Sequence, residues 1–226
     1  MLRILQISAM ALSLGASAAC AQPFTGEAIA ISTDKKGIGF DEVFRISPKH
    51  DSLTSVASIA VPGGPESLVI DSAGGRAFTH LWSGTSVVID LRSRKVAVKW
   101  PNRCDGSRGI AYDEHSQFLF AGCAEGQAVV MDAAHCGRVL ATASAGSGVD
   151  IIDYDPVRRH LYLPGARSAT MTIFSVAANG SLTQLATMPT AHGAHCVTTD
   201  GKDAYVCDPD RGRILVVRDS FPAANH

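Results

Sequence analysis

The segment Glu66-Ser-Leu-Val-Ile-Asp71 has three counterparts further along the chain. Each counterpart carries a short run of apolar, aromatic or β-branched residues and ends in aspartate. They are Arg108-Gly-Ile-Ala-Tyr-Asp113, Asp150-Ile-Ile-Asp-Tyr-Asp155 and His195-Cys-Val-Thr-Thr-Asp200. The closing aspartates are 42, 42 and 45 residues apart. A recurrence of this length indicates a repeat protein in which each unit is one supersecondary element.

A second motif keeps the same spacing and indicates what each unit contains. Ala77-Phe78 recurs as Leu119-Phe120, Leu161-Tyr162 and Ala204-Tyr205. Stretches rich in Val, Ile, Phe and Tyr alternate with turn residues, and this pattern predicts short strands. In the first complete unit we expect strands at 67–71, 76–81, 85–91 and 95–100. Four strands in about 42 residues are typical of a propeller blade, so the sequence predicts an all-β fold of the β-propeller class.

The repeat also sets the expected domain organisation, which is one β-propeller domain over residues 22–226. Complete repeats are expected near 66–107, 108–149 and 150–194, with partial blades near 28–61 and 195–219. In the first partial blade, Val43–Ser47 and Ser55–Val61 resemble the third and fourth strands of a unit. Ala28–Ser32 is expected to add one more strand, and an N-terminal strand that completes the last blade would be the usual way to close a propeller.

The chain has room for four or five blades of about 42 residues, or for part of a larger ring. An incomplete ring would leave one apolar blade face exposed to solvent. The sequence therefore predicts either a small closed ring or an open row of blades that is prone to homo-oligomerisation.

Several repeats resemble those of the YVTN-type β-propeller repeat family. The similarity covers about residues 39–219, and three segments carry it: Gly106-Ser-Arg-Gly-Ile-Ala-Tyr-Asp113, Gly148-Val-Asp-Ile-Ile-Asp-Tyr-Asp-Pro156 and Ala194-His-Cys-Val-Thr-Thr-Asp200. The resemblance implies an exported bacterial protein with a quinoprotein-like propeller of seven or eight blades. This chain is too short for such a ring, and the family's repeats are specific for fold rather than for a reaction.

The N-terminus predicts the compartment. Arg3 precedes an apolar stretch, Ile4–Leu14, and Ala19-Cys20-Ala21 fits an A-x-A cleavage site, so residues 1–21 are expected to be a secretory signal peptide. The alternative is a lipoprotein signal in which Cys20 is acylated, although Ser17 stands where that motif usually has leucine. No later stretch has the length of a transmembrane helix. The expected location is the periplasm or the exterior, with a lipid anchor as the less favoured alternative.

Composition and motifs exclude several classes of function. The formal net charge is -1 and only 6% of the residues are aromatic, which argues against a protein held on nucleic acid by charge or stacking. The chain has no nucleophile elbow, no HExxH, no phosphate-cradling glycine loop and no haem-attachment motif. No cofactor is required by the sequence.

Five cysteines remain after Cys20 is removed with the leader. Cys196 and Cys207 stand at neighbouring ends of two strands in one blade, which favours a disulfide. Cys104 and Cys123 lie in connections that open on the same propeller face and form the second candidate pair. Cys136 is left over in a turn on the opposite face. Free buried thiols or a metal site remain alternatives for these residues.

The expected binding site is the mouth of the central channel. Glu66, Arg108, Asp150 and His195 each lie five residues before a repeat aspartate, so the repeat register predicts that they converge there. Three more polar residues are assigned to the same mouth: His80, His192 and Asp208. Such a group could bind an anion, a divalent metal or a small polar ligand. Mutual pairing that only holds the blades together is the alternative, and the repeat aspartates themselves are expected to hydrogen-bond turns.

Three functions are compatible with these features. The first is a binding or scaffold propeller of the bacterial cell envelope, with a protein or small-molecule partner. The second is a hydrolase of the lactonase type, in which Glu66, Asp150 and His195 hold a metal that polarises the substrate carbonyl. The third is a redox-partner subunit, which rests on fold analogy alone.

Overall fold

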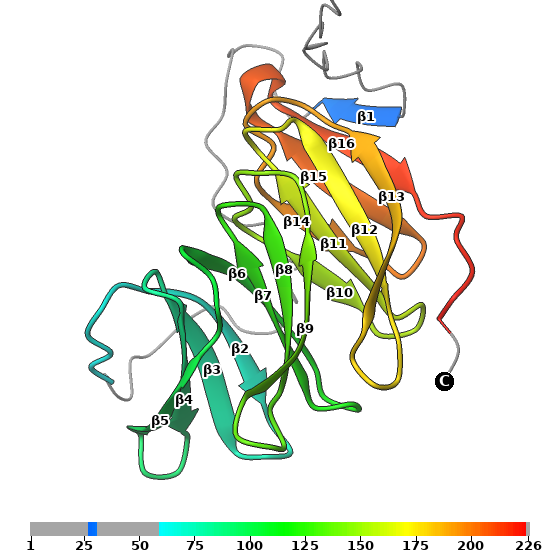
Figure 1. Cartoon of the computed structure of the whole chain (residues 1–226). Helices are drawn as coiled ribbons and strands as arrows, with labels where there is room; N and C mark the ends of the chain where they lie inside the picture. Colours follow the sequence, from blue (N-terminus) through cyan, green and yellow to red (C-terminus); the bar gives the residue numbers. More distant parts are fainter. Residues whose placement is uncertain (1–26, 31–58, 225–226) are drawn as a thin grey trace, which may run out of the picture.

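The computed structural model describes residues 27–30 and 59–224. In this part of the chain the regular structure is almost entirely β, and one 3₁₀ turn, Pro209–Arg211, follows β15. The strands form four antiparallel sheets of four strands each (Figure 1). The first sheet contains β2 (Pro65–Asp71), β3 (Arg76–Leu81), β4 (Thr85–Asp90) and β5 (Lys95–Pro101). The second contains β6 (Ser107–Asp113), β7 (Phe118–Cys123), β8 (Gln127–Asp132) and β9 (Arg138–Ser144).

The third and fourth sheets repeat this plan. The third contains β10 (Asp153–Asp155), β11 (His160–Gly165), β12 (Thr170–Val176) and β13 (Leu182–Pro189). The fourth contains β14 (Val197–Thr199), β15 (Asp203–Asp208), β16 (Arg213–Arg218) and β1 (Glu27–Ala30). The all-β propeller class is thus confirmed, and the four strands expected in the first complete unit are β2 to β5. We call these sheets blades 1 to 4.

The N-terminal strand expected near residues 28–32 is β1, which pairs antiparallel with β16 and completes blade 4. The strand expected at Val43–Ser47 and the first part of the one at Ser55–Val61 lie outside the described residues. Residues 59–61, which are described, are not in a strand. The predicted signal peptide and Cys20 also lie outside the described residues, which contain no helix long and apolar enough to span a membrane.

The repeat aspartates fix the turns between the first two strands of each blade, as expected. Asp71 accepts a hydrogen bond from the backbone N–H of Gly74 at 2.8 Å, and Asp155 accepts one from Val157 at 2.8 Å. Asp113 also accepts a hydrogen bond from the Tyr154 hydroxyl of the next blade, at 3.2 Å. A short carboxylate therefore closes each turn and, at Asp113, also links two blades.

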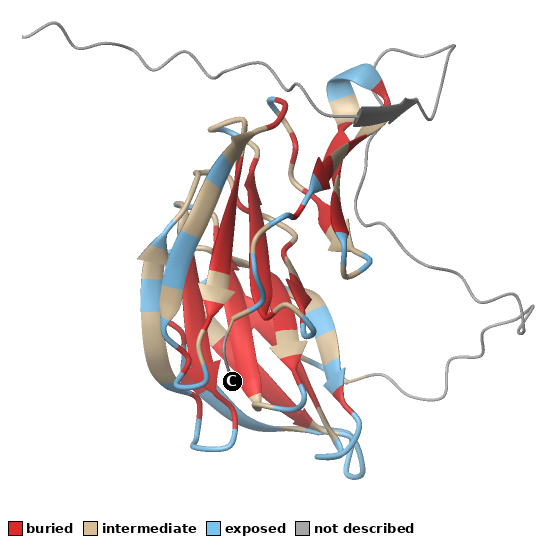
Figure 2. Cartoon of the chain, turned by 90° about the vertical axis from the view of Figure 1, so that its right-hand side faces the viewer, coloured by how far each residue is buried: buried red, intermediate tan, exposed pale blue. Residues whose placement is uncertain are grey.

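The blades pack in sequence order around the innermost strands. β2 lies against β6, β6 against β10 and β10 against β14. The buried residues are concentrated on the strands of the packed sheets (Figure 2). The position three residues before the repeat aspartate faces the preceding blade. At that position Ile110, Ile152 and Val197 are 8%, 4% and 4% exposed, because a neighbouring blade covers each of them.

Among the described residues, blade 1 has no such neighbour on its inner strand, and the four blades do not form a closed ring. The equivalent residue there is Leu68, which is 59% exposed, and Ile70 on the same side of β2 is 56% exposed. Further out on this face, Leu81 and Val87 are buried, with Ile59 and Val61 packed against them. The exposed apolar face expected of an incomplete ring is therefore present, limited to the strip nearest the channel. Homo-oligomerisation remains a prediction.

An isoleucine-to-valine substitution should lower the free energy of unfolding more at an interface between blades than on the exposed face of blade 1. Ile152→Val is expected to lower the free energy of unfolding by about 1 kcal/mol, because a methyl group is lost from a packed interface between blades. Ile70→Val should change it by less than about 0.5 kcal/mol, because the side chain is already exposed. Urea unfolding of both variants checks this, and an equal loss in the two would contradict the open arrangement of the blades.

The cysteines pair as expected. Cys104 bonds to Cys123 and Cys196 to Cys207, with Cα–Cα distances of 5.3 and 5.5 Å. Cys136 is free and exposed. The Cys104–Cys123 bond connects the loop after β5 to the end of β7, so it ties blade 1's last connection to blade 2.

Candidate functional site

The mouth of the channel is built from the positions where the innermost strands begin. Arg108, the second residue of β6, extends back to Glu66 on β2, and its Nη1 donates to both carboxylate oxygens at 3.2 Å. The guanidinium also lies over the ring of Trp82, with Cζ 4.0 Å from the ring centroid. Trp82 follows β3 and is 53% exposed. Two residues of blade 1 thus hold an arginine of blade 2 in a fixed position at the surface.

An open pocket of about 370 Å³ adjoins this arginine. Arg108, Asp150 and His195 line it, together with Arg167 and five small or apolar residues: Ala124, Gly148, Val149, Ala166 and Gly193. Three of the four residues that the repeat register placed at the mouth therefore share one pocket, and Glu66 joins them through Arg108. Convergence of these four positions follows from the repeat, because each occupies the same place in its blade.

The electrostatics of the mouth combine two acids with two arginines. Burial raises the pKa of Glu66, the Arg108 guanidinium opposes this, and the Asp150 carboxylate adds to the rise, so the net pKa lies above its ordinary value. Glu66 and Asp150 are therefore close enough to influence each other. A site of this kind can hold a ligand that carries both donors and acceptors.

Backbone hydrogen bonds between blades make the pocket rim rigid. The Gly148 N–H donates to the Ala124 carbonyl at 2.9 Å, and the Gly193 N–H donates to the Ala166 carbonyl at 2.9 Å. Arg167 Nη2 donates to the same Ala124 carbonyl at 2.6 Å. Gly148 has φ +84°, and a Cβ there would lie 2.6 Å from the Arg167 backbone nitrogen. Only glycine allows this close approach without displacing Arg167.

Sequence reasoning missed Trp82 and Arg167. Both follow the second strand of a blade, in the turn that opens on the same face as the start of the first strand. The two residues are not at equivalent positions of their repeats, since Trp82 follows Asp71 by 11 residues and Arg167 follows Asp155 by 12, so the repeat register does not mark them.

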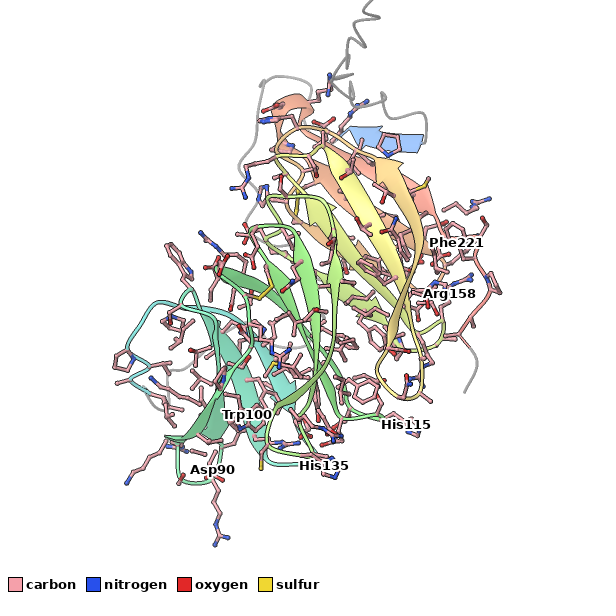
Figure 3. The ribbon with its side chains drawn as sticks, in the orientation of Figure 1. Asp90, Trp100, His115, His135, Arg158 and Phe221 are labelled. Carbon is pink, nitrogen blue, oxygen red and sulfur yellow. A yellow bond between two sulfur atoms is a disulfide. The ribbon has the colours of Figure 1, made fainter. Side chains whose placement is uncertain are left out.

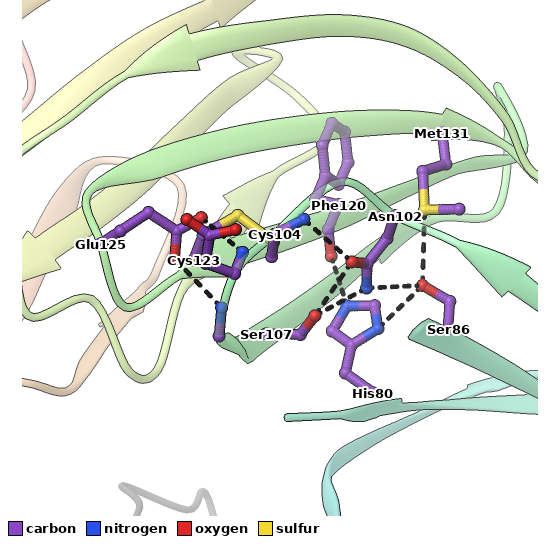
Figure 4. The surroundings of a disulfide bond; sticks show 11 residues. His80, Ser86, Asn102, Cys104, Ser107, Phe120, Cys123, Glu125 and Met131 are labelled. Carbon is purple, nitrogen blue, oxygen red and sulfur yellow. Dashed lines mark hydrogen bonds between the residues drawn. A yellow bond between two sulfur atoms is a disulfide. The ribbon is translucent and has the colours of Figure 1, made fainter. Parts of the chain in front are cut away.

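His80 is not at the channel mouth, and that expectation is wrong. The side chain is completely buried between blades 1 and 2, where Nε2 lies 3.3 Å from the Phe120 carbonyl and Nδ1 lies 3.0 Å from the Ser86 hydroxyl. Asn102 extends the network by donating to Ser86 and Ser107, beside the Cys104–Cys123 disulfide (Figure 4). Residues alternate between the two faces of β3, and position 80 faces the neighbouring blade rather than the channel.

The other two residues assigned to the mouth also lie apart from the pocket. Asp208 is completely buried and forms an ion pair with Arg213 at 2.7 Å. His192 is exposed in the loop before β14 and is not among the residues that line the pocket. Proximity in sequence to His195 and Cys207 was not enough to place these side chains at the mouth.

Metal-ligating atoms converge at two places among the described residues. One group is His195, Cys196 and Cys207, and the other is Cys104, Cys123 and Glu125. Glu66 and Asp150 belong to neither group. The metal ligands proposed from the sequence for a hydrolase are therefore near one another without forming a compact set.

Comparisons with known proteins support the fold. No protein-family model and no curated protein matches the chain. The crystal structure of the mitotic checkpoint complex is similar with a TM-score of 0.60 and 18% identity, over 69% of this chain and 49% of that one. The hydrazine synthase of Kuenenia stuttgartiensis has a TM-score of 0.55 and 17% identity, over 74% of this chain and 53% of that one. The chain spans about half the length of the solved chains it matches, and the likeness concerns the fold alone.

Proposed function

We propose that the protein is an exported, non-catalytic binding module of the bacterial cell envelope, and that its partner docks at the channel mouth. The observation that carries this proposal is the arrangement of Arg108, which is held between Glu66 and the exposed ring of Trp82 at the rim of an open pocket. Arginine and tryptophan are the residue types that contribute most to protein interfaces, above all when they are held in place before binding.

The proposed location rests on the N-terminal sequence and on the cysteines. Residues 1–21 have the order of charge, apolar stretch and small residues of a signal peptide. Two disulfides join four of the five cysteines that follow, and disulfides persist in oxidising compartments such as the periplasm. The resemblance to YVTN-type repeats supports the same location.

The lactonase alternative receives less support from the geometry. Both carboxylate oxygens of Glu66 accept hydrogen bonds from Arg108. The guanidinium therefore lies where a metal ion bound by these oxygens would have to lie. The redox-partner alternative likewise has no observation in its favour. Both stay predictions.

The proposal is tested by capture from envelope extracts, with chemical cross-linking and quantitative mass spectrometry. Arg108→Ala and Trp82→Ala are expected to reduce the recovery of a specific partner at least about tenfold, which is the loss of one well-placed interface contact. Arg92→Ala is the control, because Arg92 is an exposed arginine in a turn between β4 and β5, at the other end of the blade.

The partner is then purified, and its affinity for the four proteins is measured by calorimetry. A partner that binds the Arg108→Ala and Trp82→Ala proteins as tightly as it binds the wild type would contradict a docking site at the channel mouth.

A further inference from the structure

A second group of chemically active side chains lies where blade 4 meets the pocket. The imidazole of His195 and the sulfurs of Cys196 and Cys207 have ligand atoms that all lie within 4.8 Å of one another. His195 and Cys196 precede β14, and Cys207 lies near the end of β15. The two strands are antiparallel neighbours, so the sheet itself brings the three residues together.

The surroundings of the group suit a metal ion. Both cysteines are completely buried, whereas His195 lines the open pocket, which provides a path for an ion to enter. His195 Nδ1 donates to the Gly193 carbonyl at 2.7 Å. A backbone carbonyl that accepts from one ring nitrogen orients the imidazole, as it does in many metal-binding histidines.

We propose that His195, Cys196 and Cys207 form a redox-controlled zinc site, which goes beyond the binding function proposed above. In the oxidised protein the Cys196–Cys207 disulfide leaves no thiolate to bind metal. A dithiol reductant transfers two electrons and two protons, giving two thiols and an oxidised, cyclic reductant. Zn²⁺ then binds both sulfurs and the imidazole, displacing the two thiol protons. Two thiolates, one imidazole and a fourth position open to the pocket are a known ligand set for zinc.

The second converging group lacks this chemistry. It also contains two cysteines, Cys104 and Cys123, but its third member is a carboxylate instead of an imidazole. The oxygens of Glu125 accept hydrogen bonds from the backbone N–H groups of Asp105 and Gly106, at 2.9 and 3.2 Å. This group is therefore the internal control for zinc binding to any reduced pair of cysteines.

The experiment uses the full chain and compares its oxidised and reduced forms. Native mass spectrometry and zinc titration should give one Zn²⁺ per reduced chain and none per oxidised chain. His195→Ala should weaken zinc binding by about 100-fold or more, because one of three protein ligands is lost. His192→Ala, an exposed histidine in the same loop, and Glu125→Ala should bind zinc as the wild type does.

Two further measurements locate the bound ion, and the second of them uses the wild-type chain, so it does not depend on a variant that folds. Co²⁺ in place of Zn²⁺ should give thiolate-to-cobalt charge-transfer absorption in the reduced protein, and this absorption should be lost in His195→Ala. Zinc should protect Cys196 and Cys207 from alkylation while Cys104 and Cys123 react, as peptide mapping would show. Equal zinc affinity of the oxidised and reduced forms, protection of Cys104 and Cys123 instead, or unchanged affinity in His195→Ala would each overturn the proposal. A channel mouth that fails to bind a partner would leave these outcomes unaffected.

Discussion

Replacing Asp219 with alanine is expected to lower the free energy of unfolding by about 2–6 kcal/mol, because two buried donors lose the acceptor that they share. One carboxylate oxygen of Asp219 accepts from His160 Nδ1 at 2.6 Å and from the Tyr162 hydroxyl at 2.6 Å. His160 and Asp219 are completely buried, so the alanine variant leaves two donors inside the protein without their shared acceptor.

The loss should be large because the same residues hold the C-terminal segment on blade 3. His160 Nε2 faces the Pro222 carbonyl at 3.1 Å, and Arg158 Nη1 donates to the Phe221 carbonyl at 3.0 Å. Figure 3 shows Arg158 and Phe221 side by side next to the chain end. Both ring nitrogens of His160 therefore face oxygen atoms of the C-terminal segment, one on Asp219 and one on Pro222.

Asp219 should also make the free energy of unfolding depend on pH in the acidic range. Burial alone would raise its pKa, but hydrogen bonds from Tyr162 and His160 outweigh burial and lower it. A carboxyl with a lowered pKa in the folded state contributes stability above the ordinary aspartate pKa, and this contribution is lost as the pH falls through the folded value.

Urea unfolding at neutral pH, followed by circular dichroism, measures the Asp219→Ala effect. Asp210→Ala is the control, because Asp210 is exposed in the 3₁₀ turn of blade 4. If the Asp219 and Asp210 variants had stabilities within about 0.5 kcal/mol of each other, the buried pair would not hold the C-terminal segment as described.

The second large expected effect is a decrease in the free energy of unfolding at low pH, which His80 causes. Burial lowers the pKa of His80 from 6.5 to about 4, against a small opposing contribution from the Phe120 carbonyl. Between these two values the unfolded chain binds a proton that the folded protein does not, so stability falls as the pH is lowered. A shift of this size corresponds to about 3 kcal/mol between pH 7 and pH 4.

Stability of His80→Gln measured by urea unfolding at several pH values checks this prediction. The variant loses the titrating ring, so its stability should fall less steeply between pH 6.5 and 4 than that of the wild type, whatever its stability at pH 7. His192→Gln removes an exposed histidine and should keep the wild-type profile. An unchanged slope in His80→Gln would show that other groups cause the acid sensitivity.

The repeat accounted for most of the fold because spacing is sufficient to align strands. It placed β2 to β5, the two disulfides, and the shared position of Glu66, Arg108, Asp150 and His195. It failed where the partners of a side chain matter more than its spacing. His80 and Cys207 are equivalent in register and both are completely buried, yet His80 contacts Phe120 and Ser86 whereas Cys207 forms a disulfide with Cys196. The residue types on the neighbouring strands decide these partners, and the repeat spacing does not specify them.

Other features had no signal in the repeat. Trp82 and Arg167 lie in turns whose sequences differ from blade to blade, so no motif marks them. The contacts of Asp219 join segments about 60 residues apart in a region that follows the last repeat. Such contacts depend on where the chain turns after β16, and a one-dimensional pattern of apolar residues carries no information on that path.

The uncovered strip of β2, where Leu68 and Ile70 face solvent, has a consequence for how the protein loses its order. A closed ring has no terminal blade, whereas a row of blades has one at each end, where fraying can begin. Blades 1 and 4 each pack against a single described neighbour, so local opening should start at these ends and reach blades 2 and 3 later. Different spectroscopic probes then need not report one common midpoint of unfolding, and hydrogen exchange should be slower in blades 2 and 3 than in the two terminal blades.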